Sequence, residues 1–257
     1  MNCETLILVS DKFVDFTADK KAITVSQLNA MLEVPEHIIP GTLKLIPGLG
    51  ISDNDIVELT TKINAQHTSS HRWDVSALAS RPRPAKPCLS HKRLPHNTLI
   101  GAPHQLDENR FRMDLCIDEN SELMRDHQTG QHVQGMVLVE ASRQAFLAVT
   151  EAFFQDEGED SAYFVINSMT TEFMGFVFPI RSHIDYRVVS KDINERRKKF
   201  SVEIEIIQGG EIRTRSTISF TVYPNRIISE REAALARDAV KVFLSEFQQP
   251  ASTVVAE

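Results

Sequence analysis

Cysteine is scarce in this sequence, which has three residues of it, Cys3, Cys88 and Cys116, widely spaced over 257 positions. That spacing fits neither a disulfide framework nor a metal site. Long apolar runs are also missing: none approaches the about 18–20 residues of a membrane span, and residues 6–9 are too short for the core of a signal peptide. Basic residues are fewer than acidic ones, with 28 Lys and Arg against 35 Asp and Glu. A net charge of −7 argues against a nucleic-acid binder, and we expect a soluble cytoplasmic protein without a nucleic-acid or membrane partner.

The apolar and charged fractions, 42% and 25%, are those of an ordinary globular protein. Residues 1–68 alternate candidate strands with candidate helices, which predicts a small α/β segment. The strands are expected at 5–10 and 42–46, and the helices at 26–32 and 53–65. Gly48 and Gly50 follow the second strand. Since neither the P-loop nor the GxGxxG spacing is present, a tight turn is favoured over a phosphate-binding loop.

Residues 69–96 differ in composition, because prolines alternate there with basic side chains. The prolines are Pro82, Pro84, Pro87 and Pro95. Proline lacks an N–H and fixes φ, so this density predicts a linker rather than a helix or central strand. Toward the C-terminus we expect a helix over 226–247, begun by a capping box at Ser229 and Glu232, and a disordered tail over 248–257.

Residues 97–225 carry strand-like patterns on both sides of one long apolar segment. That segment, 135–154, is apolar nearly all round, which predicts a helix buried on most sides. The candidate strands are 98–102, 110–117, 162–168, 171–178, 182–190, 200–207 and 211–223. One buried helix among antiparallel strands is an α+β order. A strongly curved sheet wrapped round that helix, the hotdog fold, would bury it.

The residues at the start of this helix resemble a known family, the A-factor biosynthesis hotdog family. Its pattern looks like D-H…H-V-P-G-M-x-L-x-E-A-x-R-Q-A. The matching residues are Asp126, His127, His132, Val133, Gly135, Met136, Leu138, Glu140, Ala141, Arg143, Gln144 and Ala145. The chain is also similar to the β-hydroxyacyl-carrier-protein dehydratases, which share a smaller part of the pattern. Arg143 and His132 favour the first family, and the resemblance covers about residues 90–225.

Two departures from the family pattern bear on assembly. Gln134 replaces the proline before the glycine, so the loop that enters the helix is less constrained. Family members commonly carry two hotdog repeats, whereas one is recognisable here. A second copy supplied by a partner chain is favoured over a degenerate repeat in the N-terminal part, because an open sheet edge tends to pair. We therefore expect a homodimer.

Glu140, Arg143 and Gln144 are spaced i, i+3 and i+4, so they share one face of the helix. In an apolar helix such residues either form an ion pair that fixes packing or belong to a site. The resemblance implies a site with Glu140 as general base or acid, where burial raises its pKa and Arg143 lowers it again. Arg143 and Gln144 would contact substrate.

Gly135 begins the helix, where free N–H groups and the helix dipole suit the oxyanion of a thioester. His127 takes the position of the catalytic histidine of the dehydratase pattern, and His132, a candidate substrate contact, lies nearer the helix. Either histidine could also be a surface residue. We expect no cofactor and no metal, because the spacing of ligands is unsuitable. The basic run 196–199 is either a solvated turn or a docking surface for an acidic carrier protein.

The resemblance implies transfer of a β-ketoacyl group from acyl carrier protein or acyl-CoA to a hydroxyl of dihydroxyacetone phosphate, toward a butyrolactone-type signal or other secondary metabolite. Two alternatives stay open. One is a hotdog dehydratase or thioesterase in which His127 and Glu140 work as a pair, and the other is a non-catalytic acyl-binding or scaffold subunit. Arg143 suits an anionic, phosphorylated acceptor, which favours the acyltransferase.

Overall fold

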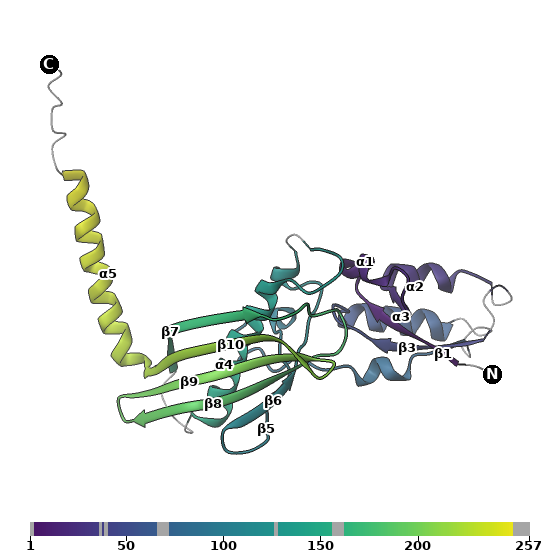
Figure 1. Ribbon diagram of the computed structural model, residues 1–257. Coiled ribbons are helices and arrows are strands. Elements are labelled where there is room, and N and C mark those ends of the chain that lie inside the picture. Colours follow the sequence, from purple (N-terminus) through teal and green to yellow (C-terminus); the bar gives the residue numbers. More distant parts are fainter. Residues whose placement is uncertain are drawn as a thin grey trace.

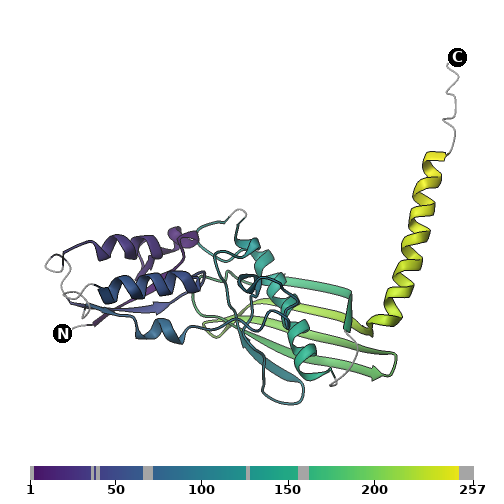
Figure 2. The same ribbon diagram turned by 180° about the vertical axis from the view of Figure 1, so that it is seen from behind.

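The computed structural model describes residues 3–35, 38, 41–65, 72–125, 128–155 and 162–248. Two units lie side by side, an α/β unit at the N-terminal end and a second unit built round a larger sheet (Figure 1). A long helix, α5 (Asn225–Gln248), extends from the far end of the second unit, and the view from behind shows the same arrangement (Figure 2). Among the described residues, no helix is both long enough and apolar enough to cross a lipid bilayer.

The N-terminal unit is a parallel four-stranded sheet with helices between its strands. The strand order is β2 (Ala22–Thr24), β1 (Cys3–Val9), β3 (Thr42–Pro47) and β4 (Trp73–Asp74). The helices are η1 (Asp11–Phe13), α1 (Val14–Thr17), α2 (Val25–Leu32), α3 (Asp53–Ala65) and η3 (Ser76–Ser80). Thr24 and Gln27 form a capping box at the start of α2, and Leu8, Leu28, Leu45 and Leu59 form the centre of this unit's own core.

The second unit is a six-stranded antiparallel sheet packed on α4 (Gly135–Phe153). The strand order is β5 (His104–Gln105), β6 (Arg110–Asp114), β8 (His183–Asn194), β9 (Arg197–Gln208), β10 (Glu211–Pro224) and β7 (Ala162–Phe173). Short 3-10 helices, η4 (Pro95–Asn97) and η5 (Glu122–Met124), lie in the connections. The predicted α+β hotdog fold is therefore confirmed.

The long helix is buried because two different parts of the chain cover it. On the sheet side, Phe146 stacks on Phe220 with ring centroids 4.4 Å apart. On another side the chain before β5 packs on the helix, and Leu99 and Ile100 belong to the same hydrophobic core. Coverage from two directions explains why residues 135–154 are apolar nearly all round.

The segment predicted as a linker, 69–96, packs against both units where it is described. Trp73 pairs in β4 and is buried in the N-terminal core, as is Leu78. Ala85 is buried in the hotdog core, and its N–H donates to the Ile100 carbonyl over 2.8 Å. The prolines prevent long regular elements, but an irregular segment can still bury its apolar side chains between two domains.

Three other boundaries differ from the sequence-based expectation. Residues 162–173 form one continuous strand, β7, instead of ending near 168. Residues 98–102 make only isolated bridges. The helix α5 begins at Asn225, so Ser229 lies inside it and donates to the Arg226 carbonyl instead of capping. The predicted disordered tail lies outside the described residues, apart from Gln248.

The turn at Gly48 and Gly50 joins the two units. The Leu49 N–H donates to the Pro179 carbonyl over 3.0 Å, and the Gly50 N–H donates to the Ile117 carbonyl over 2.9 Å. A Cβ at Gly48 would lie 2.5 Å from the Pro179 oxygen, and Gly50 has a φ of +91°. Glycine is needed here for a close approach between domains, so the favoured interpretation of a tight turn agrees with the structure.

Candidate functional site

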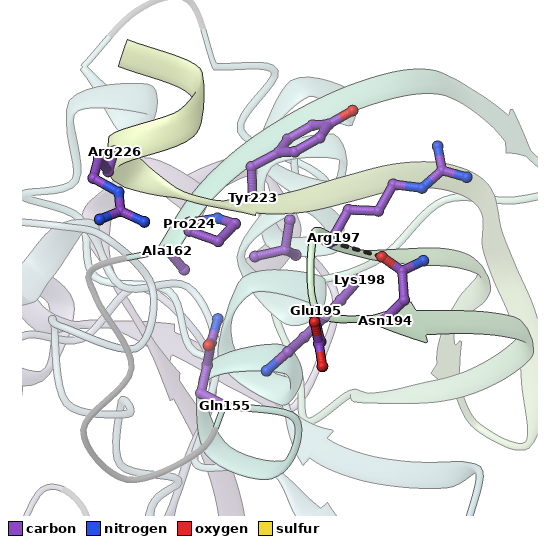
Figure 3. A pocket seen from close by; sticks show the side chains of 10 residues that line it. Gln155, Ala162, Asn194, Glu195, Arg197, Lys198, Tyr223, Pro224 and Arg226 are labelled. Atoms are coloured by element: carbon purple, nitrogen blue, oxygen red, sulfur yellow. Dashed lines mark hydrogen bonds between the residues drawn. The ribbon is translucent and has the colours of Figure 1, made fainter. Parts of the chain in front are cut away.

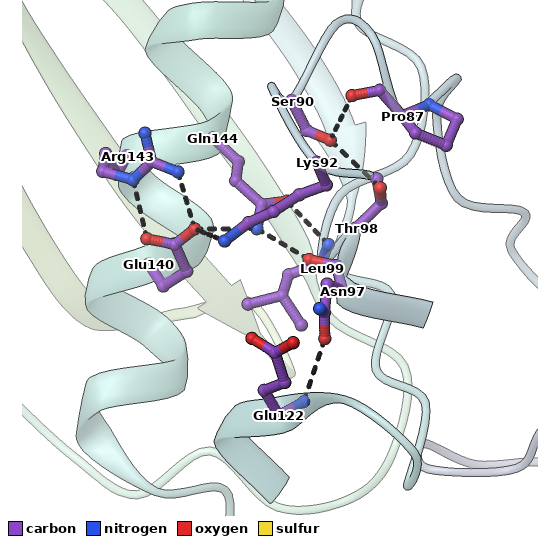
Figure 4. Close-up of polar contacts among 10 residues, drawn as sticks. All are labelled: Pro87, Ser90, Lys92, Asn97, Thr98, Leu99, Glu122, Glu140, Arg143 and Gln144. Carbon is purple, nitrogen blue, oxygen red and sulfur yellow. Dashed lines mark hydrogen bonds and ion pairs between the residues drawn. The ribbon is translucent and has the colours of Figure 1, made fainter. Parts of the chain in front are cut away.

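The helix α4 brings Glu140, Arg143 and Gln144 together, as their spacing predicts (Figure 4). The Arg143 guanidinium donates to both carboxylate oxygens of Glu140, from Nε over 2.7 Å and from Nη2 over 2.8 Å. The Gln144 Nε2 donates to Glu140 Oε1 over 3.0 Å. Two parallel bonds between a guanidinium and a carboxylate fix both orientation and distance.

A lysine that the sequence analysis did not single out completes this cluster. Lys92 Nζ lies 2.8 Å from Glu140 Oε1, so the Glu140 carboxylate forms ion pairs with both Lys92 and Arg143 (Figure 4). Lys92 belongs to the proline-rich segment, 43 positions before the start of α4 at Gly135, and no local pattern indicates that it contacts this helix. We call Lys92, Glu140, Arg143 and Gln144 the polar cluster.

The buried amide of Gln144 explains how the cluster is held in place. Its Nε2 donates to the Asn97 carbonyl over 2.9 Å, and its Oε1 accepts from the Leu99 N–H over 2.7 Å. The amide therefore satisfies the irregular backbone at 97–99 as a neighbouring strand would. This contact positions the segment that carries Lys92 against α4.

Opposing effects of burial and hydrogen bonding set the charge state of Glu140. Burial raises the pKa of this carboxyl, but hydrogen bonds from Arg143, Lys92 and Gln144 outweigh burial and lower the pKa to about 2. Glu140 is therefore a carboxylate at neutral pH. Glu140 is a weak base as long as both cations remain on it.

Gly135 and His132 lie at a different place on the same helix. They line a cavity of about 350 Å³ at the start of α4, together with apolar side chains. These are Val133, Leu138, Phe173, Met174, Phe176 and Val177, with Gly175 between them. Gly135 and Glu140 are five residues apart, so they point about 140° apart around the helix axis. Within one chain the structure thus separates the predicted oxyanion residue from the predicted base.

The start of α4 has the features expected of an anion or carbonyl site. Gln134 is extended at the N-cap position, and within the described chain its side chain makes no capping hydrogen bond. The N–H groups of the first helical turn lie at the N-terminal, positive end of the helix dipole. The cavity lies at this same end of α4. A Cβ at Gly135 would lie 3.0 Å from the Phe173 ring. His132 packs on Phe176, with ring centroids 4.4 Å apart, and the predicted catalytic His127 lies outside the described residues.

The basic run 196–199 begins in the turn between β8 and β9 and continues into the first residues of β9. A cavity of about 260 Å³ opens beside it, with Arg197, Lys198 and Arg226 around it and Glu195 among them (Figure 3). Lys198 Nζ donates to the Phe154 carbonyl over 2.7 Å, which ties one cation of the run to the end of α4. The charges are mixed, so the surface is less basic than the run itself.

Comparison with known families identifies one match. The model of the A-factor biosynthesis hotdog domain matches residues 73–224, more than half of the chain, and includes the polar cluster and the start of α4. The predicted family is confirmed. The match begins at β4, inside the segment predicted as a linker. No curated protein matches the chain.

Solved structures with similar folds include several thioesterases. A mutant thioesterase from Pseudomonas aeruginosa is 16% identical, covers 56% of this chain and 97% of its own, and has a TM-score of 0.40. A thioesterase from Haemophilus influenzae is 12% identical over 53% of this chain and 86% of its own, with a TM-score of 0.38. A hypothetical thioesterase protein with coenzyme A from Streptococcus pneumoniae is 14% identical over 48% and 84%, with a TM-score of 0.35.

Proposed function

This chain belongs to the A-factor biosynthesis hotdog family, and from that membership we propose that it is an enzyme that acts on acyl thioesters. The reaction proposed is transfer of a β-ketoacyl group from acyl carrier protein or acyl-CoA to a hydroxyl of a dihydroxyacetone-phosphate-like acceptor. The product would lead toward a butyrolactone-type signal or related metabolite. Donors of this kind place the reaction in the cytoplasm.

The observation that carries the proposal is the composition of the polar cluster. Two cations, Lys92 and Arg143, share one carboxylate, Glu140, so positive charge is in excess. The Lys92 and Arg143 side chains are 26% and 31% exposed, whereas Glu140 is 17% exposed. The two cations are therefore more accessible to a solute than the carboxylate is. A phosphorylated acceptor matches this charge, and guanidinium binds phosphate with two bonds as it binds carboxylate.

Binding of such an acceptor would change the basicity of Glu140. The hydrogen bonds from Arg143 and Lys92 lower its pKa, while burial raises it. If the acceptor phosphate takes over these donors, burial dominates and the pKa of Glu140 rises. Glu140 would then accept the proton of the acceptor hydroxyl. The hydroxyl oxygen bonds to the thioester carbon, the carbon–sulfur bond breaks, and the departing thiolate takes that proton.

The donor would use the cavity at the start of α4. Its lining is mostly apolar, which suits an acyl chain, and the N–H of Gly135 would hold the thioester oxygen as negative charge develops. This cavity and the polar cluster lie on different faces of one α4 helix. We propose that they meet between two copies of the chain.

The edge strand β7 supports that pairing. Among the described strands β7 pairs with β10 alone, so its other edge is open. Phe173, at its end, contacts Gly135. His91, beside Lys92 in sequence, packs on Phe164 of β7 with ring centroids 5.2 Å apart. Both halves of the proposed site thus lie along the open edge, where a homodimer would form.

A defined assay tests the reaction. The protein is incubated with a β-ketoacyl thioester, with and without dihydroxyacetone phosphate, and free thiol and phosphorylated ester are measured by mass spectrometry. The proposal expects ester that depends on the acceptor. Thiol release at the same rate without acceptor would indicate a thioesterase, and a folded protein that releases no thiol would contradict catalysis on these donors.

A further inference from the structure

The helix α5 is anchored to the hotdog unit near its beginning, at Glu232. Tyr163 of β7 donates its hydroxyl hydrogen to the Glu232 carboxylate over 3.0 Å, and beyond this point α5 extends away from the sheet (Figures 1 and 2). Its 24 residues correspond to a length of about 36 Å. An isolated amphipathic helix of this length is marginal in water unless its apolar face packs on something.

The exposed part of α5 has one apolar face. The side chains on it are Leu235, Val240, Val242, Phe243 and Phe247, each between 57% and 74% exposed. Helical spacing places these residues on one half of the helix surface, with Glu246 among them, opposite Arg237, Lys241 and Ser245. Leu244, 51% exposed, lies outside this half, beside Arg237. No part of the chain that the structure describes covers this face.

A second uncovered apolar surface surrounds the start of α4. It consists of Met136, Phe173, Met174 and Phe176, which are 58%, 56%, 54% and 62% exposed. We call these four residues the end patch, because they lie at the end of β7 where Phe173 is its last residue. Phe173, Met174 and Phe176 also line the cavity proposed to hold the acyl chain.

Strand pairing between two copies would bring these surfaces together. α5 leaves the sheet at the beginning of β7, because Pro224, just before α5, pairs with Ala162. The end patch lies at the opposite end of β7. In an antiparallel pair of β7 strands, related by a twofold axis, the beginning of one strand lies beside the end of the other. Figure 1 shows α5 running past the β7 edge, on the side where a paired strand would lie.

We propose that α5 is an arm that packs on a second copy of this chain, with its apolar face on the end patch of that copy. Its length suffices to cross the end of a second six-stranded sheet, about 24 Å between outer strands. Each arm would cover the cavity at the start of α4 in the second copy. Each copy would therefore contribute side chains to the acyl-binding cavity of the other copy. The inference rests on the homodimer in the proposed function and not on the reaction.

Matched substitutions on α5 test the arm by sedimentation of the full chain. Phe243→Asp places a charge on the apolar face, and Ser245→Asp places the same charge on the opposite face two residues away. The inference expects a dimer in the wild type and about tenfold or greater weakening of the dimer by Phe243→Asp. Ser245→Asp should sediment as the wild type does. Because both sites are exposed, circular dichroism should show equal folding.

The end patch requires a third variant. Met174→Asp should weaken the dimer as much as Phe243→Asp does, and a wild-type dimer for either variant would overturn the inference. A monomeric wild type would overturn it too. If Phe243→Asp kept the dimer and lost binding to phosphatidylglycerol vesicles, the face would belong to a lipid surface, and the inference would be wrong. A dimer held by α5 that transfers no acyl group would contradict the proposed reaction alone.

Discussion

At the scale of single residues, the side chains around Glu140 decide what the site does. The sequence predicts the contact with Arg143 and Gln144 from helical spacing, and the structure confirms it. The sequence could not predict how far the pKa of Glu140 is lowered, because the third hydrogen-bond donor, Lys92, comes from a segment without regular structure. Three donors on one half-buried carboxylate stabilise its charged form more than burial destabilises it.

Removal of Lys92 should therefore raise the pKa of Glu140. Lys92→Met keeps the side-chain length and removes one donor, and we expect a rise of about one unit above the value near 2. A carboxyl whose folded pKa is lowered contributes stability above its unfolded pKa and loses that contribution as the pH falls through the folded value. The variant should therefore lose less stability on acidification, and that loss should be complete at a higher pH than in the wild type.

NMR titration of the Glu140 carboxyl carbon measures this shift directly. Lys191→Met is a matched control, because Lys191 pairs with Glu108 elsewhere on the surface, and it should leave the Glu140 titration unchanged. An unchanged pKa in Lys92→Met would show that Lys92 does not stabilise the carboxylate.

At the scale of elements, periodicity predicted well where one face is clearly buried. The helix α4 begins at the predicted Gly135 because its apolar run and glycine mark the start. Two strands were predicted over 162–168 and 171–178, yet β7 continues through residues 169–170 and ends at Phe173, because an edge strand tolerates exposed polar side chains. The linker prediction missed β4, since a two-residue strand gives no periodic signal.

The contact between α4 and residues 97–99 should be energetically important. Gln144→Leu keeps the volume but leaves the Asn97 carbonyl and the Leu99 N–H without their buried partner. Each such group costs about 1–3 kcal/mol, so we expect a loss of about 2–4 kcal/mol in the free energy of unfolding, measured with urea. Thr150→Val is the control, because the Thr150 hydroxyl, also buried, bonds only within its own helix. It should cost less than about 1 kcal/mol. Equal losses would refute the role of Gln144.

At the scale of the whole molecule, the junction of the two units carries a group with a shifted pKa. The Glu119 N–H donates to the Gly50 carbonyl over 2.8 Å, next to the glycine turn that the sequence identified. Burial raises the pKa of the Glu119 carboxyl to about 7, and the charges of Asp55, Asp11 and Asp118 add to the rise. No local pattern predicts this cluster, because its members come from three separate segments of the chain.

Stability of the junction should therefore fall as the pH rises from 4.5, the ordinary pKa of this carboxyl, to about 7, its pKa in the folded protein. A carboxyl with a raised folded pKa holds its proton in the folded state after the unfolded state has lost it, so stability falls between the two pKa values and levels off above about pH 7. Glu119→Gln should raise the free energy of unfolding at pH 8 by on the order of 1–2 kcal/mol, a figure reduced because the side chain is partly exposed to solvent. At pH 5 the substitution should change this free energy much less. Urea unfolding at both pH values measures this. Glu122→Gln, at an exposed neighbouring position, is the matched control.

The central claim is that the polar cluster performs acyl-thioester chemistry, and Glu140→Gln tests it most directly. The matched control is Asp185→Asn, which removes the carboxylate from a similar bidentate pair with Arg112 far from the cluster in sequence. Turnover of a β-ketoacyl thioester with dihydroxyacetone phosphate is measured for both variants and the wild type. The account predicts that Glu140→Gln loses about 10²-fold or more with only about 1 kcal/mol of destabilisation, because both cations reach solvent, while Asp185→Asn keeps full activity. A folded Glu140→Gln protein with wild-type turnover would contradict the account.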